Sequence, residues 1–406
     1  MKTIINHFTD NDLYTFTCMY YILQKYPRAE TEYCFFDRRY TCYPKGFDRL
    51  LREQLEHLSE VVITDEEREF MTRAFPFLPY WFINVFLCGF RFNPSELTIR
   101  QDEEGHLDIR VKGKWWSTII WEMPILATIS ELMHTLNGDA EKYDAEVEYE
   151  KSLQKGRKIW LNGLTLGDMG TRRRFSFDHQ ERVIDALIQS YAEVKEETDG
   201  HCGKFTGTSN VYFAMKKNIP CLGTMSHQCI SFEEVVSGVF ECNYNVMNKW
   251  SEVYDGNVGI FLYDCFGDNV FFNNLSKRMA MTFCGLRIDS GVEEEQVDLI
   301  VEKYNQLGID PMTKQAVFSN GLDIGRAIEI HNYCKGKITD SYGVGTFLTC
   351  DVTDCKPMNI VVKLIRGRIT ESREWHPCVK LSCDKGKTLG DKAKCDYLLS
   401  VLDEGK

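Results

Sequence analysis

Positive charge is scarce in this 406-residue sequence. Lys and Arg total 48 against 60 Asp and Glu, which gives a formal net charge of −12 at pH 7. A protein that binds nucleic acid through its phosphates normally carries a basic surface. The composition therefore argues against a nucleic-acid-binding protein, and an anionic ligand would have to be bound by local clusters of basic residues.

Long hydrophobic runs are also missing. The first residues lack the sustained apolar segment of a secretion signal. The longest apolar stretch, residues 75–90, is interrupted by Pro76, Pro79 and Asn84 and is too short to span a bilayer. These absences predict a cytoplasmic protein, and 43% hydrophobic content suffices for one large or two ordinary domains.

The 16 cysteines lack the tight two-residue spacing of a zinc knuckle. Without a secretion signal we expect reduced and mostly buried thiols. The one group that merits consideration as metal ligands is Cys350, Cys355, Cys378 and Cys383, whose gaps are loose. The sequence therefore identifies no metal site formed by protein ligands alone, and it disfavours a zinc-dependent nucleic-acid binder.

The first 130 residues predict a mixture of helices and a sheet. Apolar residues recur at helical spacing over residues 11–27, and residues 48–58 and 65–74 indicate two more helices. Apolar and polar residues alternate over 97–100 and 107–111 around Glu104-Gly105, which predicts a hairpin. We expect Trp115 to Trp121 to continue this sheet and residues 124–156 to return to helix. Residues 1–130 are thus predicted to form an α+β entry domain.

From about residue 160 onward, short apolar strands end in Gly, Asp or Ser and helices follow. The predicted strands lie at residues 164–166, 221–222, 258–264, 286–291 and 316–321, with another ending near 340–346. Repeated units of this kind are typical of a barrel of parallel strands. We therefore predict an α/β barrel over residues 131–356. The remaining residues, 357–406, are expected to pack on the entry domain through a strand at 359–365, with a final helix near 391–402.

The motif around His227 is the central candidate for chemistry. Cys221-Leu222 is predicted to be a short strand that ends at Gly223, and Ser231 with Glu234 resembles a capping box that opens a helix over 231–250. His227 would then lie in a strand-to-helix loop, where α/β proteins carry their ligand chemistry. A single histidine is weak evidence, so the case depends on the other strand ends.

Those other strand ends carry a consistent set of polar residues. Arginine clusters bind phosphate or carboxylate, glycine turns bind phosphate through backbone N–H groups, and aspartates hold Mg²⁺ or a sugar hydroxyl or face a developing cation. Singly, each has a structural alternative: a solvated arginine, a helix cap, or a simple turn. Together these residues predict group transfer on a phosphorylated sugar. The set consists of Arg172 to Arg174, Thr206, Thr208, Ser209, Asp264, Arg287, Asp289, and the turns 319–321 and 343–346.

Several ordered motifs carry a resemblance to a known family. Asp168-Met169-Gly170-Thr171-Arg172, Gly207-Thr208-Ser209-Asn210, Gly223-Thr224-Met225-Ser226-His227, Arg287-Ile288-Asp289-Ser290-Gly291 and Gly343-Val344-Gly345-Thr346 stand in this order. The chain resembles the nicotinate phosphoribosyltransferases over nearly its whole length. The resemblance implies an irregular α/β barrel of the type II phosphoribosyltransferase kind, with an entry domain and a homodimer whose site lies at the subunit interface.

The resemblance also implies an activity. The family joins nicotinate to 5-phosphoribosyl 1-diphosphate in NAD salvage, giving nicotinate mononucleotide and diphosphate, with Mg²⁺ and with ATP hydrolysis coupled through a phosphohistidine. This reaction would make the chain an ATP-dependent enzyme of the ligase class. Carried over motif by motif, the catalytic residues are His227 (also the phosphorylated residue), Asp289 and Asp264. The expected nicotinate contacts are Tyr14, Met169, Ser209, Thr224 and Arg287, and the expected phosphoribosyl or phosphate contacts are Arg172, Gly321, Gly345 and Thr346.

The sequence departs from the family pattern in places that bear on affinity. Thr15 stands where many members have Lys, and Met169 stands where relatives often have Phe against the pyridine ring. Ile288 and Val292 also replace a common His and Asp. Two alternatives stay open: a nicotinamide-specific relative and a non-catalytic barrel. Nicotinamide enzymes typically carry Asp where Ser209 stands, so Ser209 favours nicotinate.

Overall fold

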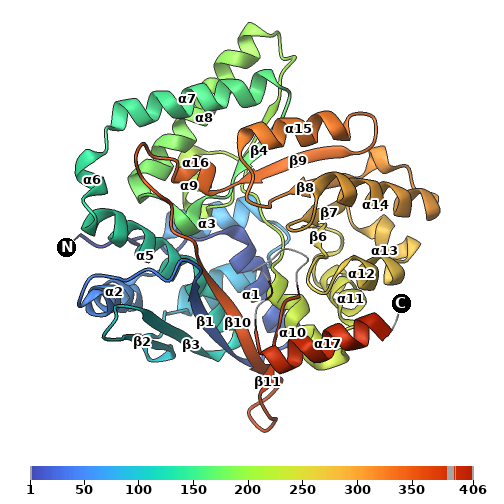
Figure 1. Ribbon diagram of the computed structural model, residues 1–406, viewed down its shortest axis with the longest axis horizontal. Helices are drawn as coiled ribbons and strands as arrows, with labels where there is room; N and C mark the ends of the chain where they lie inside the picture. The colour runs from blue at the N-terminus through green and yellow to red at the C-terminus, as the bar shows by residue number, and fades with distance from the viewer. Residues whose placement is uncertain (1, 382–387, 389, 405–406) are drawn as a thin grey trace.

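Two β-sheets organise the chain in the computed structural model, which describes residues 2–381, 388 and 390–404 (Figure 1). One sheet is antiparallel with five strands in the order β11-β10-β1-β3-β2, and the other is parallel with six strands in the order β5-β4-β9-β8-β7-β6. Among the described helices, none combines the length and the apolar character that crossing a bilayer requires. Cys383, one of the four cysteines considered as metal ligands, lies outside the described residues.

The antiparallel sheet joins the two ends of the sequence. Its strands are β1 (Glu30–Asp37), β2 (Leu97–Gln101), β3 (Leu107–Lys114), β10 (Ile360–Arg368) and β11 (His376–Pro377). Strand β10 pairs with β1 over its length, with Phe35 opposite Val362. The predicted hairpin and the predicted return of residues 359–365 to the entry sheet are therefore confirmed, whereas the domain boundaries at 130 and 356 stay a prediction.

The entry helices follow the sequence periodicity closely. They are α1 (Leu13–Lys25), α2 (Phe47–Glu56) and α3 (Asp65–Ala74), and α3 begins with a complete capping box between Thr64 and Glu67. The expectation that residues 115–121 continue the sheet is wrong. They form α4 (Trp115–Thr118) and a 3₁₀ turn, Ile119–Trp121. Lys114 already faces Glu30, the first residue of β1, so no partner strand extends further.

The helical region predicted at 124–156 is divided into three helices. These are α5 (Glu122–Leu136), α6 (Asp139–Lys142) and α7 (Ala145–Leu161). Gly138 adopts a φ of 74°, which ends the run of α5, and the Asp144 carboxylate caps α7 by accepting from the backbone N–H groups of Glu146 and Val147.

The parallel sheet places the carboxyl ends of its strands along one edge. Its strands are β4 (Thr165–Asp168), β5 (Lys204–Thr208), β6 (Ile260–Leu262), β7 (Gly285–Ile288), β8 (Gln315–Phe318) and β9 (Thr339–Val344). The main helices between them are α8 (Phe177–Glu197), α9 (Val211–Lys217), α14 (Glu293–Gln306) and α15 (Ile324–Cys334). Within the described residues no strand pairing closes β5 onto β6, which makes the barrel irregular.

The segment around His227 differs from the sequence-based expectation. Cys221 makes only an isolated bridge to Thr208, so residues 221–222 are not a strand. The helix begins at His227 rather than at Ser231, as α10 (His227–Ser237), with Ser226 as its cap. Gly238, at φ 82°, then separates α10 from α11 (Cys242–Tyr254). His227 is therefore the first residue of a helix, and Ser231 is a buried residue inside it.

The remaining helices complete the surroundings of the parallel sheet. Helices α12 (Asp268–Asn274) and α13 (Lys277–Thr282) follow β6, and α16 (Thr346–Thr349) follows β9. The predicted final helix is present as α17 (Lys392–Glu404), which lies close to α10 (Figure 1).

Candidate active site

The three predicted catalytic residues meet beside the ends of β6 and β7. His227 Nε2 lies 2.7 Å from Asp264 Oδ1 and 3.7 Å from Asp289 Oδ2. Asp264 follows β6, Asp289 follows β7, and the hydroxyl of Ser290 donates to Asp264 Oδ2 over 2.6 Å. The shared edge of a parallel sheet explains why residues that are far apart in the sequence converge here.

Lys380 completes this cluster, and sequence reasoning missed it. Its Nζ lies 2.8 Å from His227 Nε2, 3.0 Å from Asp264 Oδ2 and 4.0 Å from Asp289 Oδ2. The lysine follows β11 and is 153 positions away from His227. Nothing in the local sequence separates it from the other lysines of the C-terminal region, because only the packing of this segment beside α10 brings it to the site.

Burial and neighbouring charges set the protonation of the cluster. Burial and the ammonium of Lys380 lower the pKa of His227 to about 4, although Asp264 opposes this shift. Burial alone would raise the pKa of Asp289, but Arg287 and His227 outweigh it and lower the value to about 2. The pKa of Asp264 is likewise held well below its usual range. At neutral pH the site therefore holds a neutral imidazole, two carboxylates and an ammonium.

Arg287 orients Asp289. Its Nε donates to Ser319 Oγ over 2.8 Å, and Ser319 Oγ donates onward to Asp289 Oδ1 over 2.8 Å. A second guanidinium nitrogen, Nη2, lies 3.5 Å from the same carboxylate oxygen. The arginine on β7 and the serine after β8 thus hold the carboxylate in place, and Ser319 is a site residue that the sequence suggested only as part of a turn.

A second group of polar residues surrounds Tyr14. The Tyr14 hydroxyl donates to Glu122 Oε2 over 2.7 Å, and the Arg172 guanidinium lies 5.7 Å from the centre of the Tyr14 ring. Arg172 Nη1 is 3.6 Å from Glu122 Oε1. Tyr14 and Arg172 are predicted site residues, whereas the buried Glu122, which joins them, was not predicted.

A small cavity connects the Glu122 region with the catalytic cluster. It runs between α10 and β10, where the antiparallel sheet meets the barrel. Burial lowers the pKa of Lys363, on β10, to about 8. The residues that line this cavity are Tyr33, Glu122, Ser226, His227, Gln228, Ser231, Val362, Lys363, Leu364 and Lys380.

The other predicted nicotinate contacts face protein groups; Ser209 follows β5, Met169 follows β4, and Thr224 lies in the segment before α10. Ser209 Oγ donates to Asp12 Oδ1 over 2.8 Å, so its one proton is already used by a carboxylate. The side chain of Met169 packs against Gly343, where an added Cβ would lie 2.3 Å from the methionine sulfur. Thr224 is half-buried, and its carbonyl oxygen accepts from Thr17 Oγ1.

The predicted phosphate-binding turns follow β8 and β9. Gly321 is exposed with a φ of 48°, a backbone conformation that favours glycine. Gly345 and Thr346 are half-buried at the start of α16, and an added Cβ on Gly345 would lie 2.9 Å from the carbonyl oxygen of Met169. The turn after β9 is thereby held against the end of β4, next to Arg172.

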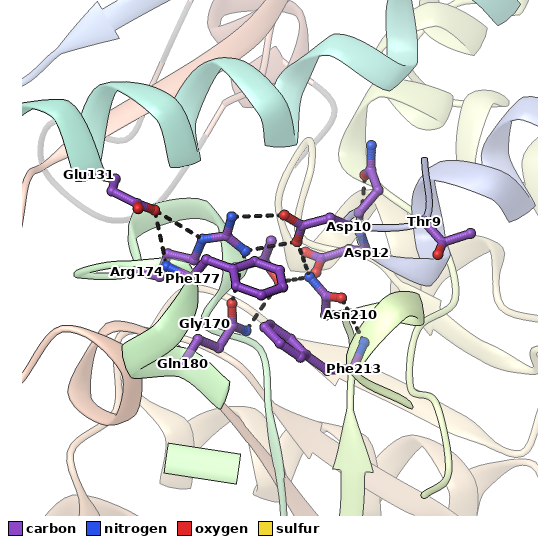
Figure 2. A network of polar contacts seen from close by, with 12 residues as sticks. Thr9, Asp10, Asp12, Glu131, Gly170, Arg174, Phe177, Gln180, Asn210 and Phe213 are labelled. Carbon is purple, nitrogen blue, oxygen red and sulfur yellow. Dashed lines mark hydrogen bonds and ion pairs between the residues drawn. The ribbon is translucent and has the colours of Figure 1, made fainter. Parts of the chain in front are cut away.

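Arg174 has a structural role, in contrast to Arg172. Its guanidinium forms a bidentate pair with Asp10, at 2.7 and 2.8 Å, and is fully buried (Figure 2). Asn210 donates to the same Asp10 carboxylate over 2.8 Å. This network ties the segment before α1 to the loops after β4 and β5, so Arg174 is not available to a substrate anion.

Comparison with known proteins identifies the family. Residues 9–130 match the nicotinate phosphoribosyltransferase (NAPRTase) N-terminal domain, and residues 164–406 match the nicotinate phosphoribosyltransferase (NAPRTase) family. A nicotinate phosphoribosyltransferase of Desulforapulum autotrophicum is 37% identical over 402 residues, which cover 99% of this chain and 100% of the relative. Another of Chromohalobacter salexigens is 34% identical and covers 98% of each chain.

Solved structures agree on the whole fold. A crystal structure of nicotinate phosphoribosyltransferase from Porphyromonas gingivalis has a TM-score of 0.92 at 38% identity and covers 98% of this chain and 100% of its own. A putative nicotinate phosphoribosyltransferase from Saccharomyces cerevisiae reaches a TM-score of 0.91 at 25% identity and covers 99% of both chains. The predicted fold class is confirmed, and the chain belongs to the nicotinate phosphoribosyltransferase family.

Proposed function

We propose that this chain joins nicotinate to 5-phosphoribosyl 1-diphosphate in NAD salvage, releasing nicotinate mononucleotide and diphosphate. The observation that carries the proposal is the ionised Asp289, held by Arg287 and Ser319 beside His227, Asp264 and Lys380. The test is to supply 5-phosphoribosyl 1-diphosphate with either nicotinate or nicotinamide and to identify the mononucleotide. Nicotinate should be the preferred base, and turnover of neither base would contradict the proposal.

The arrangement suits a reaction at the anomeric carbon of ribose. As the diphosphate leaves and the pyridine nitrogen attacks, positive charge develops on the ribose ring. A fixed carboxylate beside that charge stabilises the transition state without reorganising during the reaction. Asp289 fits this role because its orientation is set before substrate binds. Arg172 and the turn Gly345–Thr346 would bind the negative charge of the phosphoribosyl and diphosphate groups.

The donor set also fits a hydrated Mg²⁺. His227, Asp264 and Asp289 each present a donor atom, and these atoms lie within 4.8 Å of one another. Mg²⁺ prefers carboxylate and phosphate oxygens and keeps several waters, so the two aspartates are its expected protein ligands together with substrate phosphates. When bound, it would offset the charge of the leaving diphosphate.

ATP coupling through His227 forms the finer part of the proposal. With its pKa lowered to about 4, the imidazole is neutral at working pH and has a nucleophilic lone pair. Nε2 already faces Asp264 and Lys380 at 2.7 and 2.8 Å. Attack from Nδ1 places the proton on Nε2, which would donate to Asp264, and Lys380 would help to balance the negative charge of the phosphate. Phosphorylation state and substrate affinity would then be linked.

Incubation with γ-labelled ATP is expected to place an acid-labile, base-stable label on His227. The wild-type protein should take up the label, and His227→Ala should not. His331→Ala is a matched control, because His331 pairs with Asp340 at 2.8 Å away from the catalytic cluster. Equal labelling of the His227→Ala protein would exclude His227 as the acceptor.

The preference for nicotinate rests on the charges around the pocket. A bound carboxylate requires nearby cations, and Arg287 and Lys363 supply them at or beside the cavity. Ser209, in place of the aspartate of nicotinamide-specific relatives, adds no negative charge. Its hydroxyl donates a hydrogen bond to the buried Asp12. Burial raises the pKa of Asp12, although Arg172 and the Ser209 hydroxyl act in the opposite direction.

Ser209→Asp should lower kcat/KM for nicotinate by roughly 10- to 1000-fold, or about 1.4 to 4 kcal/mol. A carboxylate at 209 would repel both Asp12 and the substrate carboxylate in a desolvated region. Repulsion from Asp12 would affect both bases, so the diagnostic quantity is the ratio of kcat/KM for nicotinate to that for nicotinamide. Ser209→Asn is the neutral control. A ratio that stays constant in Ser209→Asp would show that position 209 does not discriminate between the bases.

We further propose that this protein is cytoplasmic and forms a homodimer. Tyr80, Trp81 and Val85 expose 70%, 43% and 65% of their surface around the π-helical turn Phe82–Leu87. Aromatic and apolar side chains gathered in this way are typical of surfaces that become covered on association. Light scattering should give twice the mass of one chain.

A further inference from the structure

A second cluster of metal-ligating side chains lies away from the catalytic cluster. His134 Nδ1 is 2.8 Å from Asp139 Oδ2. Donor atoms of His134, Asp139 and Cys355 all lie within 4.8 Å of one another. His134 comes from the last turn of α5, Asp139 begins α6, and Cys355 belongs to the loop after α16. The proposed reaction does not use these residues.

The buried Cys350 supports the histidine from its other side. Cys350 Sγ lies 3.4 Å from His134 Nε2, so the two ring nitrogens face different partners. In protein metal sites, a ligating imidazole usually has its second nitrogen bonded to an outer group that fixes the ring. The ring also packs against Phe175 in a tilted arrangement, with 4.8 Å between the ring centroids. His134 is therefore held with Nδ1 directed toward Asp139.

The loop that carries Cys355 is held in a defined conformation. Asp354 has a φ of 62°, and Cys355 N donates to the carbonyl oxygen of Val352 over 3.0 Å. The backbone N–H of Thr353 donates to the buried Glu148 carboxylate over 2.9 Å. Aspartate is one of the few non-glycine residues that adopts this left-handed conformation readily, and the two hydrogen bonds fix the loop around it.

We propose that His134, Asp139 and Cys355 bind a zinc ion, with Cys350 as the outer partner of the imidazole. Nitrogen, oxygen and thiolate donors at about 2.0 to 2.3 Å are the ordinary ligands of zinc. Two ligand atoms on one zinc ion lie roughly 3 to 4 Å apart, so the donor atoms of His134, Asp139 and Cys355 would have to move by about 1 Å to bind it. The thiolate favours zinc over Mg²⁺ or Ca²⁺, which prefer oxygen ligands.

The electrostatic surroundings suit a divalent cation. The carboxylates of Asp139, Glu148 and Asp354 place negative charge near Cys355, and Lys142 supplies the nearby positive charge. A thiol binds zinc as its thiolate, so binding would release the proton of Cys355. The ion would fasten the corner between α5 and α6 to the loop that follows the Gly345–Thr346 turn, which gives it a structural role beside the phosphate site.

The test uses reduced, chelator-stripped full-length protein titrated with Zn²⁺ against a chromophoric chelator, and separately with Co²⁺. Wild type should bind one ion per chain tightly, and its Co²⁺ form should show a sulfur-to-cobalt charge-transfer band. Cys355→Ser should lose the band and bind zinc at least about 100-fold more weakly. Asp139→Asn should keep the band with reduced affinity. The matched control is Cys42→Ser, since Cys42 is an exposed thiol of the entry domain.

The outcomes separate this site from the catalytic cluster, which contains no thiol and cannot give the charge-transfer band. Thermal melting of each variant, stripped of metal, shows whether it is folded. Equal zinc affinity and an equal band in wild type and Cys355→Ser would overturn the proposal. So would wild-type protein that binds no ion at micromolar zinc.

Discussion

Asp289→Asn is expected to lower kcat by about 10²-fold or more, the usual cost of removing one preorganised electrostatic group. The substitution keeps the shape of the side chain but removes its charge and replaces one acceptor oxygen with an NH2 donor. Since Arg287 and Ser319 already hold the group in place, the ground-state geometry should persist. The loss should therefore appear in kcat more than in KM for either substrate.

Steady-state rates of mononucleotide formation test this expectation. Asp298→Asn is the matched control, because Asp298, on α14, forms an exposed ion pair with Lys337. The control should retain the wild-type kcat. A folded Asp289→Asn protein with unchanged kcat would show that this carboxylate does not face the developing cation.

Lys380→Met is expected to lower kcat by about 10- to 100-fold. The ammonium lies within 4.0 Å of His227, Asp264 and Asp289, and without it two carboxylates would remain side by side with less compensation. Lys380→Arg keeps the positive charge and should recover part of the rate. Because Lys380 acts through the imidazole and the carboxylates, it is a positioning residue, and the pH profile gives a more specific test than the rate.

The acid limb of the pH profile should move upward in Lys380→Met. Burial and Lys380 lower the pKa of His227 to about 4, while Asp264 and Asp289 act in the opposite direction. Removing the ammonium leaves the carboxylates to stabilise the imidazolium, so the pKa of His227 should rise. If the neutral imidazole is the active form, activity is lost as pH falls through that pKa, and the variant should lose activity at higher pH than wild type. An unchanged acid limb would mean that Lys380 does not set the protonation of His227.

The convergence of Asp264 and Asp289 could be predicted because it follows from local rules, whereas His227 reaches them from the start of α10 and not from the expected strand end. Each short apolar strand ends in a polar residue, and parallel strands end at a common edge. Helix α3 could be predicted for a similar reason, since Thr64 and Glu67 form its capping box within four residues. Features that depend on residues close together in the sequence could therefore be predicted from the sequence alone.

The missed residues depend on contacts between distant segments. Lys380 is 153 positions from His227, and Glu122 is 108 positions from Tyr14. Arg172 and Arg174 have similar local sequences, yet Arg174 forms a bidentate pair with the buried Asp10, whereas Arg172 lies 3.6 Å from Glu122 beside the cavity. No local pattern distinguishes such residues, because the tertiary arrangement decides which charge finds a partner.

Two local errors came from competing signals of similar strength. Ser226 and Ser231 are both good helix caps, and the structure uses the earlier one. Trp115 to Trp121 is rich in residues that favour strands, but Trp115 and Trp121 are fully buried and the chain turns into helix where β3 loses its partner. Burial against the rest of the molecule outweighed the local preference in this segment.

The most direct measurement of the central claim is mononucleotide formation from nicotinate and 5-phosphoribosyl 1-diphosphate with Mg²⁺, with and without ATP, in wild type and His227→Ala. Wild type should form nicotinate mononucleotide, and ATP should raise its kcat/KM. The His227→Ala protein should lose the stimulation by ATP. No product from wild type, or equal stimulation by ATP in both proteins, would contradict the account.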